Sequence, residues 1–307
     1  MRAVVVEQWG GPEVLVEREV ERPEPGLNEV LVRVHAAGVN PVDWKTRAGG
    51  ALIEWGEVPA VGWDVSGTVE AVGPGVGMFR PGDEVFGMPL FPRQAGAYAE
   101  YVVAPARHLA AKPASLTHAE AAALPLAALT AWQALVDTAD VRPGERVLIH
   151  AAAGGVGHLA VQIAKARGAY VIGTASAGKH DLVRQLGADE VIDYRTVRFE
   201  DAVSDIDVVL DGLGGQSAER SVQVLRDGGR LITLPGPDDV PATPDQVRAV
   251  WMLVEPDHLG LREIAALVER GALKPVIETV LPLAEAAKAH EIGEQGRTTG
   301  KIVLTVA

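Results

Sequence analysis

The stretch 147–157 reads VLIHAAAGGVG, and it decides the fold. Its first four residues form a short, mainly apolar run, which is typical of a strand buried on both faces of a parallel sheet. Residues 158–167 (HLAVQIAKAR) repeat apolar side chains at helical spacing and stop before Gly168, a residue type that often ends helices. The sequence therefore predicts a strand, a glycine-rich turn and a helix in direct succession.

The predicted turn contains glycines at points where the backbone must approach a partner closely. Such a turn places unpaired N–H groups and the positive end of a helix dipole around one point, which suits a pyrophosphate. Glycines occur in many turns, but a glycine turn between a buried strand and a helix is far more specific. We therefore predict a dinucleotide site whose backbone groups come from Gly154, Gly155, Val156 and Gly157.

The end of the next strand indicates which dinucleotide is bound. NAD sites usually carry Asp or Glu about 20 residues beyond the glycine turn, where it holds the ribose 2′-hydroxyl. Here the second strand ends in Gly-Thr-Ala-Ser (173–176), with no carboxylate to repel a 2′-phosphate. Ser176, Lys179 and Tyr194, with Arg195 beside it, suit a phosphomonoester. The pattern favours NADPH over NADH; the alternative is that Lys179 and Arg195 are ordinary surface charges.

Composition excludes several classes of function. The chain has 307 residues, enough for two domains, and 48% of them are hydrophobic. Its net charge is −13 and no Lys/Arg cluster stands out, so nucleic acid is not an expected partner. No apolar run approaches the roughly 18 residues of a membrane span, and the N-terminus does not resemble a signal peptide. The absence of cysteine excludes disulfides and Cys-ligated metals, and the expected location is cytoplasmic.

Strand and helix patterns alternate in the second half of the chain, as in a doubly wound parallel sheet. The expected strands are 147–150, 169–175, 190–194, 206–211 and 229–234. Residues 1–120 instead contain β-rich runs broken by Gly and Pro, as in a barrel-like antiparallel domain.

The chain closes with an amphipathic helix (259–270) and the strand-like GKIVLTV (300–306), which needs partners in the β-rich domain. We therefore predict an α/β protein in which the catalytic domain is discontinuous. It would comprise residues 1–124 and 259–307, with a nucleotide-binding domain (125–258) inserted between them.

Motifs spread over nearly the whole chain carry a resemblance to a known family. They are GVNPVDWKTRAG (38–49), VGWDVSGTVEAVGPGV (61–76), PGDEVFG (81–87), GAYAEYVV (96–103), HAAAGGVG (150–157), GADEVIDYR (187–195) and GKIVL (300–304). In combination they resemble the medium-chain dehydrogenase/reductase superfamily, in its zinc-independent quinone oxidoreductase (zeta-crystallin-like) branch. The resemblance implies a GroES-like catalytic domain, a Rossmann domain that binds NADPH, and an active site in the cleft between them.

The residues at the family's zinc positions argue against a metal. In the metal-bearing relatives a Cys starts the site, and a Gly-His-Glu sequence supplies further groups. This chain has Asn40 at the Cys position, while Trp63 and Asp64 replace His and Glu. Because zinc needs three or four converging N, S or O ligands, no metal is expected.

The resemblance also assigns residues to the nicotinamide end of the cofactor. Asn40 would bond the nicotinamide ribose, and Thr130 would line the ring face. Leu234 and Gly236 would offer backbone groups to the carboxamide, and Lys301 matches a lysine that often approaches the cofactor. The alternatives are a turn-forming role for Asn40, helix packing for Thr130 and no cofactor contact for Lys301.

Aromatic residues indicate where a planar substrate could bind. The chain has six tryptophans against four each of Phe and Tyr, and Trp44, Trp55 and Trp63 lie close together in the N-terminal domain. Flat apolar faces suit a quinone ring or an enone, and Phe91 is a further candidate for the pocket. The alternative for each of them is packing in the core or between domains.

Proton delivery depends on the substrate. Reduction of an enone leaves an enolate, which needs a proton and gains from an oxyanion partner. Lys45 resembles a lysine of the enone-reducing relatives, so it is the candidate polariser, and Asp43 is expected to orient it by an ion pair. The alternative for both is a surface salt bridge. No tyrosine follows RAGG (47–50), where mitochondrial-type enoyl-thioester reductases keep their acid, which argues against an acyl thioester.

The sequence thus predicts an NADPH-dependent reductase of quinones or activated enones, with Asn40, Asp43, Lys45 and Thr130 as catalytic residues and no metal. One alternative is a dedicated enone or enoyl reductase of a biosynthetic pathway. Another is a non-catalytic NADPH-binding protein, although such a protein would not need Asn40 and Thr130. By resemblance the protein is expected to form a homodimer through its Rossmann sheet.

Overall fold

The computed structural model describes residues 1–49 and 60–306, and the chain divides into two compact units. One unit, here called the β-rich unit, comprises Met1–Leu129, Glu255–Arg270 and Pro275–Ala307. The other, the α/β unit, comprises Thr130–Val254 and Gly271–Lys274. The predicted domain boundaries at 124/125 and 258/259 fall a few residues from these limits, and as limits of function they stay predictions.

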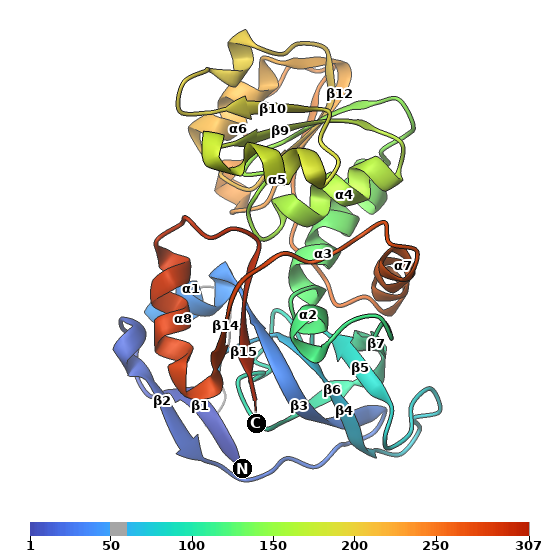
Figure 1. Cartoon of the computed structure of the whole chain (residues 1–307), viewed down its shortest axis with the longest axis vertical. Coiled ribbons are helices and arrows are strands. Elements are labelled where there is room, and N and C mark those ends of the chain that lie inside the picture. The colour runs from blue at the N-terminus through green and yellow to red at the C-terminus, as the bar shows by residue number, and fades with distance from the viewer. Residues whose placement is uncertain (50–59, 307) are drawn as a thin grey trace. The chain divides into compact units, whose positions relative to one another are not determined.

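The α/β unit is built on a six-stranded sheet in which every neighbouring pair of strands is parallel. Its strands are β8 (Arg146–Ile149), β9 (Tyr170–Ala175), β10 (Glu190–Asp193), β11 (Ile206–Asp211), β12 (Leu225–Thr233) and β13 (Arg248–Trp251). The order across the sheet is β10-β9-β8-β11-β12-β13, so the first strand of the unit lies at its centre. This is the strand order of a Rossmann fold, and the predicted doubly wound sheet is confirmed (Figure 1).

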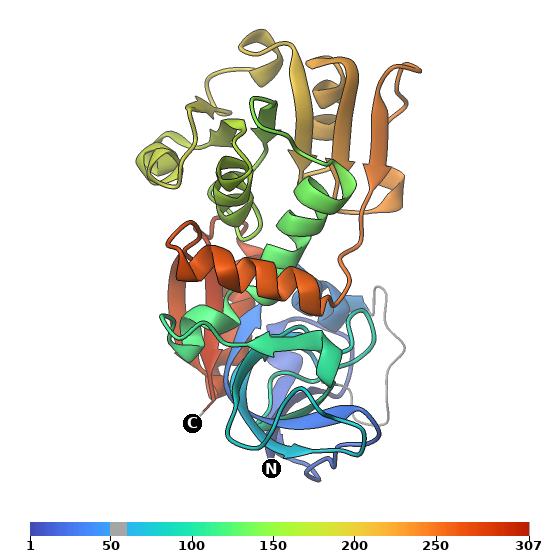
Figure 2. The same cartoon turned by 90° about the vertical axis from the view of Figure 1, so that its right-hand side faces the viewer.

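The helices of the α/β unit follow the strands as crossover connections. They are α4 (Gly157–Ala166), α5 (His180–Gln185) and α6 (Gln216–Val222). Helix α3 (Pro125–Trp132), whose first five residues belong to the β-rich unit, precedes the first strand and continues as a π-helical turn, Gln133–Thr138. Figure 2 shows the later strands of the sheet, in yellow to orange, running side by side. Because all the strands are parallel, their carboxyl ends share one edge, where ligands of such sheets bind.

Two details of this sheet were not predicted. β12 begins at Leu225, four residues before the expected start at 229, and β13 was missed altogether. β13 is a four-residue edge strand whose side chains are half-buried or exposed, so its sequence carries no buried apolar run. A strand of this kind is specified by its neighbour β12, with which it pairs from Arg248 to Trp251.

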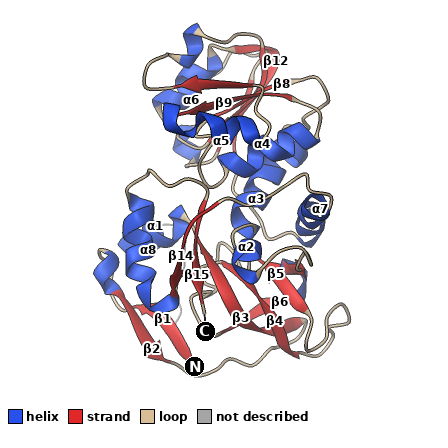
Figure 3. Cartoon of the chain, viewed as in Figure 1, coloured by secondary structure: helices blue, strands red, loops and turns tan. Residues whose placement is uncertain are grey.

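The β-rich unit contains a seven-stranded sheet and a separate two-stranded one (Figure 3). Its strands are β1 (Arg2–Val6), β2 (Leu15–Glu19), β3 (Glu29–Val39), β4 (Asp64–Val72), β5 (Glu84–Gly87), β6 (Tyr101–Pro105), β7 (Leu109–Ala111), β14 (Ile277–Pro282) and β15 (Lys301–Thr305). The large sheet has the order β14-β15-β3-β4-β5-β7, and β6 also pairs with β3. The C-terminal β15 lies between β14 and β3, which confirms that it completes the β-rich unit.

Four helices lie wholly within the described part of the β-rich unit. They are α1 (Pro41–Gly49), α2 (His118–Ala122), α7 (His258–Glu269) and α8 (Ala286–Glu294). Asp257 caps α7, because its carboxylate accepts from the amides of Leu259 and Gly260, and this confirms the predicted amphipathic helix within one residue. Short 3₁₀ turns occur at Pro12–Val14, Ala106–His108, Ala177–Lys179, Phe199–Asp201, Pro237–Asp239 and Leu283–Glu285.

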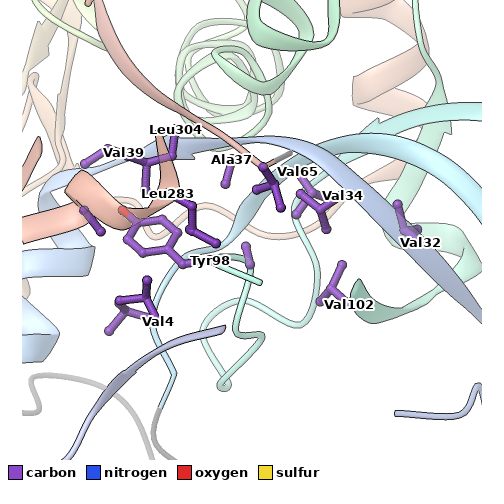
Figure 4. Close-up of a cluster of buried hydrophobic side chains, with 14 of the residues drawn as sticks. Val4, Val32, Val34, Ala37, Val39, Val65, Tyr98, Val102, Leu283 and Leu304 are labelled. Carbon is purple, nitrogen blue, oxygen red and sulfur yellow. The ribbon is translucent and has the colours of Figure 1, made fainter. Parts of the chain in front are cut away.

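The core of the β-rich unit is formed mainly by valines from β1, β3, β4 and β6, with leucines from β15 and its neighbours (Figure 4). Tyr98 is the large polar member of this cluster, and Figure 4 shows its ring among Val39, Leu283 and Leu304. Burying a phenol among apolar side chains requires a partner for its hydroxyl group. That partner belongs to the polar network described below.

No helix among residues 1–49 and 60–306 is long and apolar enough to cross a membrane.

Candidate functional site

The glycine turn after β8 is fixed by a close backbone contact. Ala151 adopts a left-handed conformation (φ 49°), and its carbonyl oxygen accepts from the amide of Gly154 at 2.8 Å. A Cβ on residue 157 would collide with that same carbonyl oxygen and would lie 2.8 Å from the Cα of Ala152. Glycine is therefore required at 157, because α4 begins directly against the preceding turn.

The turn presents backbone donors for an anion. Within the described part of the chain, the amides of Gly155, Val156 and Gly157 donate to no acceptor. They open the first turn of α4, which is ten residues long, at the positive end of its dipole. Free amides, a helix N-terminus and a backbone approach that excludes Cβ fit the pyrophosphate of a dinucleotide. The predicted turn thus has the required geometry.

The residues predicted to hold a 2′-phosphate lie at the ends of the two strands beside β8. Ser176 directly follows β9, and its carbonyl oxygen accepts from the amide of Lys179 at 2.9 Å in a 3₁₀ turn. Tyr194 directly follows β10, is 55% exposed and has the Arg195 guanidinium 5.8 Å from its ring centre. Because β9 and β10 are neighbours in a parallel sheet, these groups share its carboxyl edge.

The groups predicted for the carboxamide follow β12. The amide of Leu234 already donates to the carbonyl of Asp211 at 3.0 Å, and its carbonyl accepts from the indole of Trp251 at 3.2 Å. The amide of Leu234 is thus engaged within the sheet, and the role of Leu234 toward the carboxamide stays a prediction. Gly236 is extended and lies just before the 3₁₀ turn Pro237–Asp239. Thr130 is buried on α3.

His150 stabilises the glycine turn through the hydroxyl of Thr174, a role that the sequence did not predict. It is buried between the last residue of β8 and Ala151, and its Nδ1 lies 3.2 Å from the hydroxyl of Thr174. That hydroxyl accepts from the amide of Ala151, while Nε2 of His150 lies 2.9 Å from the hydroxyl of Ser221. Burial lowers the pKa of His150 to about 4, so the neutral ring serves as a bridge between β9 and α6.

A second group of buried polar residues lies in the β-rich unit, around Asn40. The side-chain amide of Asn40 donates to Asp64 at 2.8 Å, and its carbonyl oxygen accepts from the ammonium of Lys301. Lys301 also donates to the carbonyl of Val39 at 2.9 Å and lies 3.5 Å from Asp64. Asp64 in turn accepts from the amide of Leu126 at 2.7 Å. Asn40 and Lys301, predicted separately from their resemblance to family residues, are thus direct partners.

Charge in this cluster is balanced within the protein. Asp64 and Lys301 are both almost fully buried. Burial raises the pKa of Asp64 and lowers the pKa of Lys301, while the attraction between the two opposes both shifts. A buried ammonium held by an amide and a carboxylate provides a fixed positive charge that solvent does not screen.

Asp43 lies at the first turn of α1, three residues after Asn40, and it is fully buried. One of its oxygens, Oδ2, accepts from the amide of Asn40 at 2.7 Å and from the hydroxyl of Tyr98 at 2.8 Å. Burial is the main cause that raises the pKa of Asp43 to about 7, and Asp64 adds to it. Asp43 is therefore part of the Asn40 cluster.

The ion pair predicted between Asp43 and Lys45 is wrong. Asp43 points into the core, where it meets Asn40 and Tyr98, whereas Lys45 is exposed and makes no salt bridge with a described residue. The two residues are adjacent but one on α1, so they lie on different faces of the helix. Tyr98, which belongs to an irregular segment before β6, is the actual partner of Asp43.

The described members of the predicted aromatic set do not form a single group. Trp44 is half-buried on α1, with its ring centre 6.1 Å from that of His290 on α8. Trp63 and Phe91 are buried and pack edge to face at 5.7 Å, and the Trp63 indole donates to the carbonyl of Arg93 at 2.8 Å. Trp55 lies outside the described residues. The contacts of Trp44 are those of helix packing, while Trp63 and Phe91 form an apolar pair.

Neither unit offers a metal site in its described part, since no three His, Cys, Asp or Glu residues are grouped so as to hold an ion. At the positions that bind zinc in metal-bearing relatives, Asn40 and Asp64 are joined by their own hydrogen bond, and Trp63 packs on Phe91. The groups at these positions, one carboxylate and one amide beside the Lys301 ammonium, do not fit zinc.

Comparison with known proteins places the chain among oxidoreductases. A family model described as "Alcohol dehydrogenase GroES-like domain" matches residues 26–114, and one described as "Zinc-binding dehydrogenase" matches residues 186–304. The second description names a metal that the residues around Asn40 do not fit. The two matches cover part of each unit.

Individual relatives are similar over nearly the full chain. The quinone oxidoreductase of Homo sapiens is 36% identical, with 99% of this chain and 97% of the relative covered. An NADPH-dependent alkenal/one oxidoreductase of Arabidopsis thaliana is 38% identical over 99% of this chain and 79% of the relative. The crystal structure of an Escherichia coli quinone oxidoreductase complexed with NADPH covers 100% of both chains, with 29% identity and a TM-score of 0.89.

Proposed function

Since the chain belongs to the quinone oxidoreductase branch of the medium-chain dehydrogenase/reductase superfamily, we propose that it transfers hydride from NADPH to a quinone or an activated enone. The observation that carries the proposal is the turn from Ala151 to Gly157. It joins the central strand of a Rossmann sheet to α4 and leaves consecutive amides free for a pyrophosphate.

The preference for NADPH is supported by the end of β9. Thr174, Ala175 and Ser176 bring no carboxylate to the position where NAD-binding sheets hold the ribose hydroxyl. Lys179 and Tyr194 follow on the same edge of the sheet. The similar Arabidopsis thaliana enzyme is NADPH-dependent, and the similar Escherichia coli structure is a complex with NADPH. The proposed 2′-phosphate contacts are Ser176, Lys179 and Tyr194.

NADPH, when bound, supplies the hydride, so the protein's task is to position the cofactor and the acceptor and to polarise the acceptor. We propose that Asn40 and Lys301 act at the nicotinamide end, as their motifs suggest. Their mutual hydrogen bond and the Asp64 carboxylate hold both side chains in one arrangement before the reaction. Groups that are fixed in advance do not have to reorganise when charge moves during hydride transfer. No step of this proposal requires a metal.

A panel of acceptors tests the proposal. NADPH oxidation would be followed by absorbance with p-benzoquinone, phenanthrenequinone, a medium-chain vinyl ketone, a 2-alkenal and an enoyl thioester, with NADH in parallel. A physiological type of acceptor should reach kcat/KM of about 10⁴ M⁻¹s⁻¹ or more. Tight NADPH binding without turnover of any acceptor would instead favour the non-catalytic NADPH-binding protein.

The second candidate is a dedicated enone reductase, favoured by the similarity to an alkenal/one oxidoreductase. In that case Lys45 remains the proposed polariser, because its exposed ammonium has no salt-bridge partner among the described residues. Lys45→Ala should then lower kcat for the vinyl ketone and leave quinone reduction unchanged. A kcat for the vinyl ketone equal to that of the wild type would remove Lys45 from the mechanism.

We further propose a cytoplasmic homodimer. β13 is an edge strand of the parallel sheet, with one side unpaired within the described chain. An edge of this kind can pair with the same strand of a second copy about a twofold axis. Light scattering would test the oligomeric state, and a monomer at micromolar concentration would refute it.

A further inference from the structure

Asp43 is the end point of a chain of hydrogen bonds through the β-rich unit. From Asp43 the contacts run to the hydroxyl of Tyr98 at 2.8 Å, to Nε2 of His290 at 3.3 Å, and from Nδ1 of His290 to Arg47 at 3.2 Å. Arg47 forms a salt bridge with Glu294, whose side chain is 34% exposed. All the members except Glu294 are buried, so the chain connects the first turn of α1 with the surface of α8.

The chemistry of the members fixes the direction of these hydrogen bonds. A guanidinium only donates, so Nδ1 of His290 must accept from Arg47 and therefore carries no proton. Nε2 of neutral His290 then bears the proton and donates to the oxygen of Tyr98, which leaves the phenol hydrogen for Asp43. Every donor therefore points toward the Asp43 carboxylate, and a cation stands at the other end.

The neutral state of His290 that this direction requires is favoured by its surroundings. Burial, and next the Arg47 guanidinium, lower the pKa of His290 to about 3. The ring therefore remains a one-proton bridge throughout the neutral range. Its ring also packs edge to face on Tyr98, with ring centres 5.8 Å apart, which holds both side chains in place.

We propose that the donor chain Arg47–His290–Tyr98 keeps Asp43 in its anionic form, and that anionic Asp43 holds the Asn40 turn in the geometry required for turnover. Asp43 is then a positioning residue, and its protonation sets the acidic limit of activity. This inference rests on the proposed function, because it assigns to Asn40 a role in the reductase reaction.

The consequence of protonation follows from the contacts of Asp43. Its Oδ1 has no hydrogen-bond partner among the described residues, so a proton would be placed there without displacing Asn40 or Tyr98. Both hydrogen bonds to Oδ2 would then lose their charge assistance, which roughly halves their strength. The amide of Asn40 would be held less firmly, and with it the side chain that meets Asp64 and Lys301.

Several charges surround Asp43, and they act in opposite directions. Asp64 on β4 raises its pKa, and Lys301 on β15 lowers it. Tyr98 lowers it by its hydrogen bond, while burial, the largest cause, raises it to about 7. His290 and Glu294 on α8, and Arg47 on α1, act through the donor chain, whereas Lys45 on α1 is exposed. Tyr98 is therefore the member whose removal changes Asp43 most directly.

The experiment follows the Asn40 turn and turnover separately across the same pH range. The amide resonance of Asn40 in the ¹⁵N-labelled protein reports the ionisation of Asp43 without any acceptor or cofactor. The pH profile of kcat/KM with NADPH and phenanthrenequinone reports the reaction. Both would be recorded for the wild type, Asp43→Asn, Tyr98→Phe and His290→Gln. Tyr101→Phe, a change of the same kind on β6, serves as the matched control.

In the wild type, both curves should show a midpoint near 7. Asp43→Asn should remove both transitions, and Tyr98→Phe should move both upward by about one pH unit, since one charge-assisted hydrogen bond is lost. His290→Gln retains an acceptor for Arg47 and a donor for Tyr98, so it should move them much less. If Tyr98→Phe fails to fold, Asp43→Asn still decides whether both transitions belong to Asp43. Tyr101→Phe should match the wild type.

Two results would overturn the role assigned to Asp43. One is an Asn40 resonance that does not titrate in the neutral range, and the other is an acidic limb of kcat/KM that persists unchanged in Asp43→Asn. Loss of the proposed function is distinguishable from both, because it would appear as absence of turnover by the wild type at every pH. If the Asn40 resonance of Tyr98→Phe titrates with the same midpoint as in the wild type, the role of the donor chain is excluded, whatever the activity.

Discussion

The carbonyl oxygen of Ala151 occupies the space that a Cβ on residue 157 would need. Ala151 itself holds an unusual left-handed conformation, and its amide is bound by the hydroxyl of Thr174. The first turn of α4 is thereby held in contact with the turn that follows β8. The free amides of Gly155 to Gly157 are held in this arrangement before any ligand arrives.

Gly157→Ala should weaken NADPH binding by at least about tenfold, which corresponds to about 1.4 kcal/mol, because the new methyl group displaces either Ala151 or α4. Fluorescence titration of NADPH would measure the dissociation constant. Gly77→Ala is the control, since a Cβ there meets nothing within 4 Å. Unchanged affinity in Gly157→Ala would show that the turn relaxes without cost.

Lys179→Ala should raise the dissociation constant of NADPH by roughly tenfold and leave that of NADH within about a factor of two. One charge-assisted contact to a phosphate at a half-exposed site has about this value. Arg184→Ala on α5 removes an exposed charge nearby and controls for the general field. Equal losses for both cofactors would refute a contact with the 2′-phosphate.

Asp43→Asn should change how stability depends on pH. A carboxyl group whose pKa rises from 3.8 unfolded to about 7 folded favours the folded state below pH 3.8, and this contribution is lost as the pH rises through 7. From pH 4 to pH 8 the free energy of unfolding of the variant should therefore rise by up to about 4 kcal/mol relative to that of the wild type. Urea unfolding at both pH values measures the difference.

The control for this stability measurement is Asp181→Asn, whose carboxylate is 93% exposed and should show no such dependence. If the wild type and Asp43→Asn differ by the same free energy at both pH values, the Asp43 carboxyl does not titrate between them. The donor chain from Arg47 would then have to lower the pKa of Asp43 by more than burial raises it.

Lys301→Met should destabilise the protein by about 3–5 kcal/mol, because it leaves the buried Asp64 carboxylate without its cation. The double variant with Asp64→Asn should recover part of this loss, since both charges are then removed. Urea unfolding of the two single variants and the double variant measures the coupling. Strictly additive losses would mean that Lys301 and Asp64 do not interact.

The sequence predicted the α/β unit well because its signals are local. The glycine turn, the apolar strands and the helix after them each depend on residues within a few positions, and the sheet confirms them. β13 was missed because a short edge strand is defined by its neighbour rather than by its own side chains.

The site in the β-rich unit could be predicted only in part. Motifs identified Asn40 and Lys301, but nothing local joins Tyr98 to Asp43, 55 residues away, or to His290, 192 residues away. The sequence does not single out Tyr98 or His290, because a lone Tyr or His in an apolar stretch is usually a packed core residue. Lys45, two residues further along the chain, looked the better partner for Asp43, although residues two apart on a helix point in different directions.

The position of β15 has a consequence for the order of events during synthesis. β15 separates β14 from β3, and it carries the ammonium that pairs with Asp64. The sheet of the β-rich unit therefore has a gap, and a carboxylate without its counter-charge, until residues 301–305 have left the ribosome. All six strands of the α/β unit emerge earlier. During synthesis the α/β unit should thus fold first, and the β-rich unit should complete its sheet only when β15 becomes available.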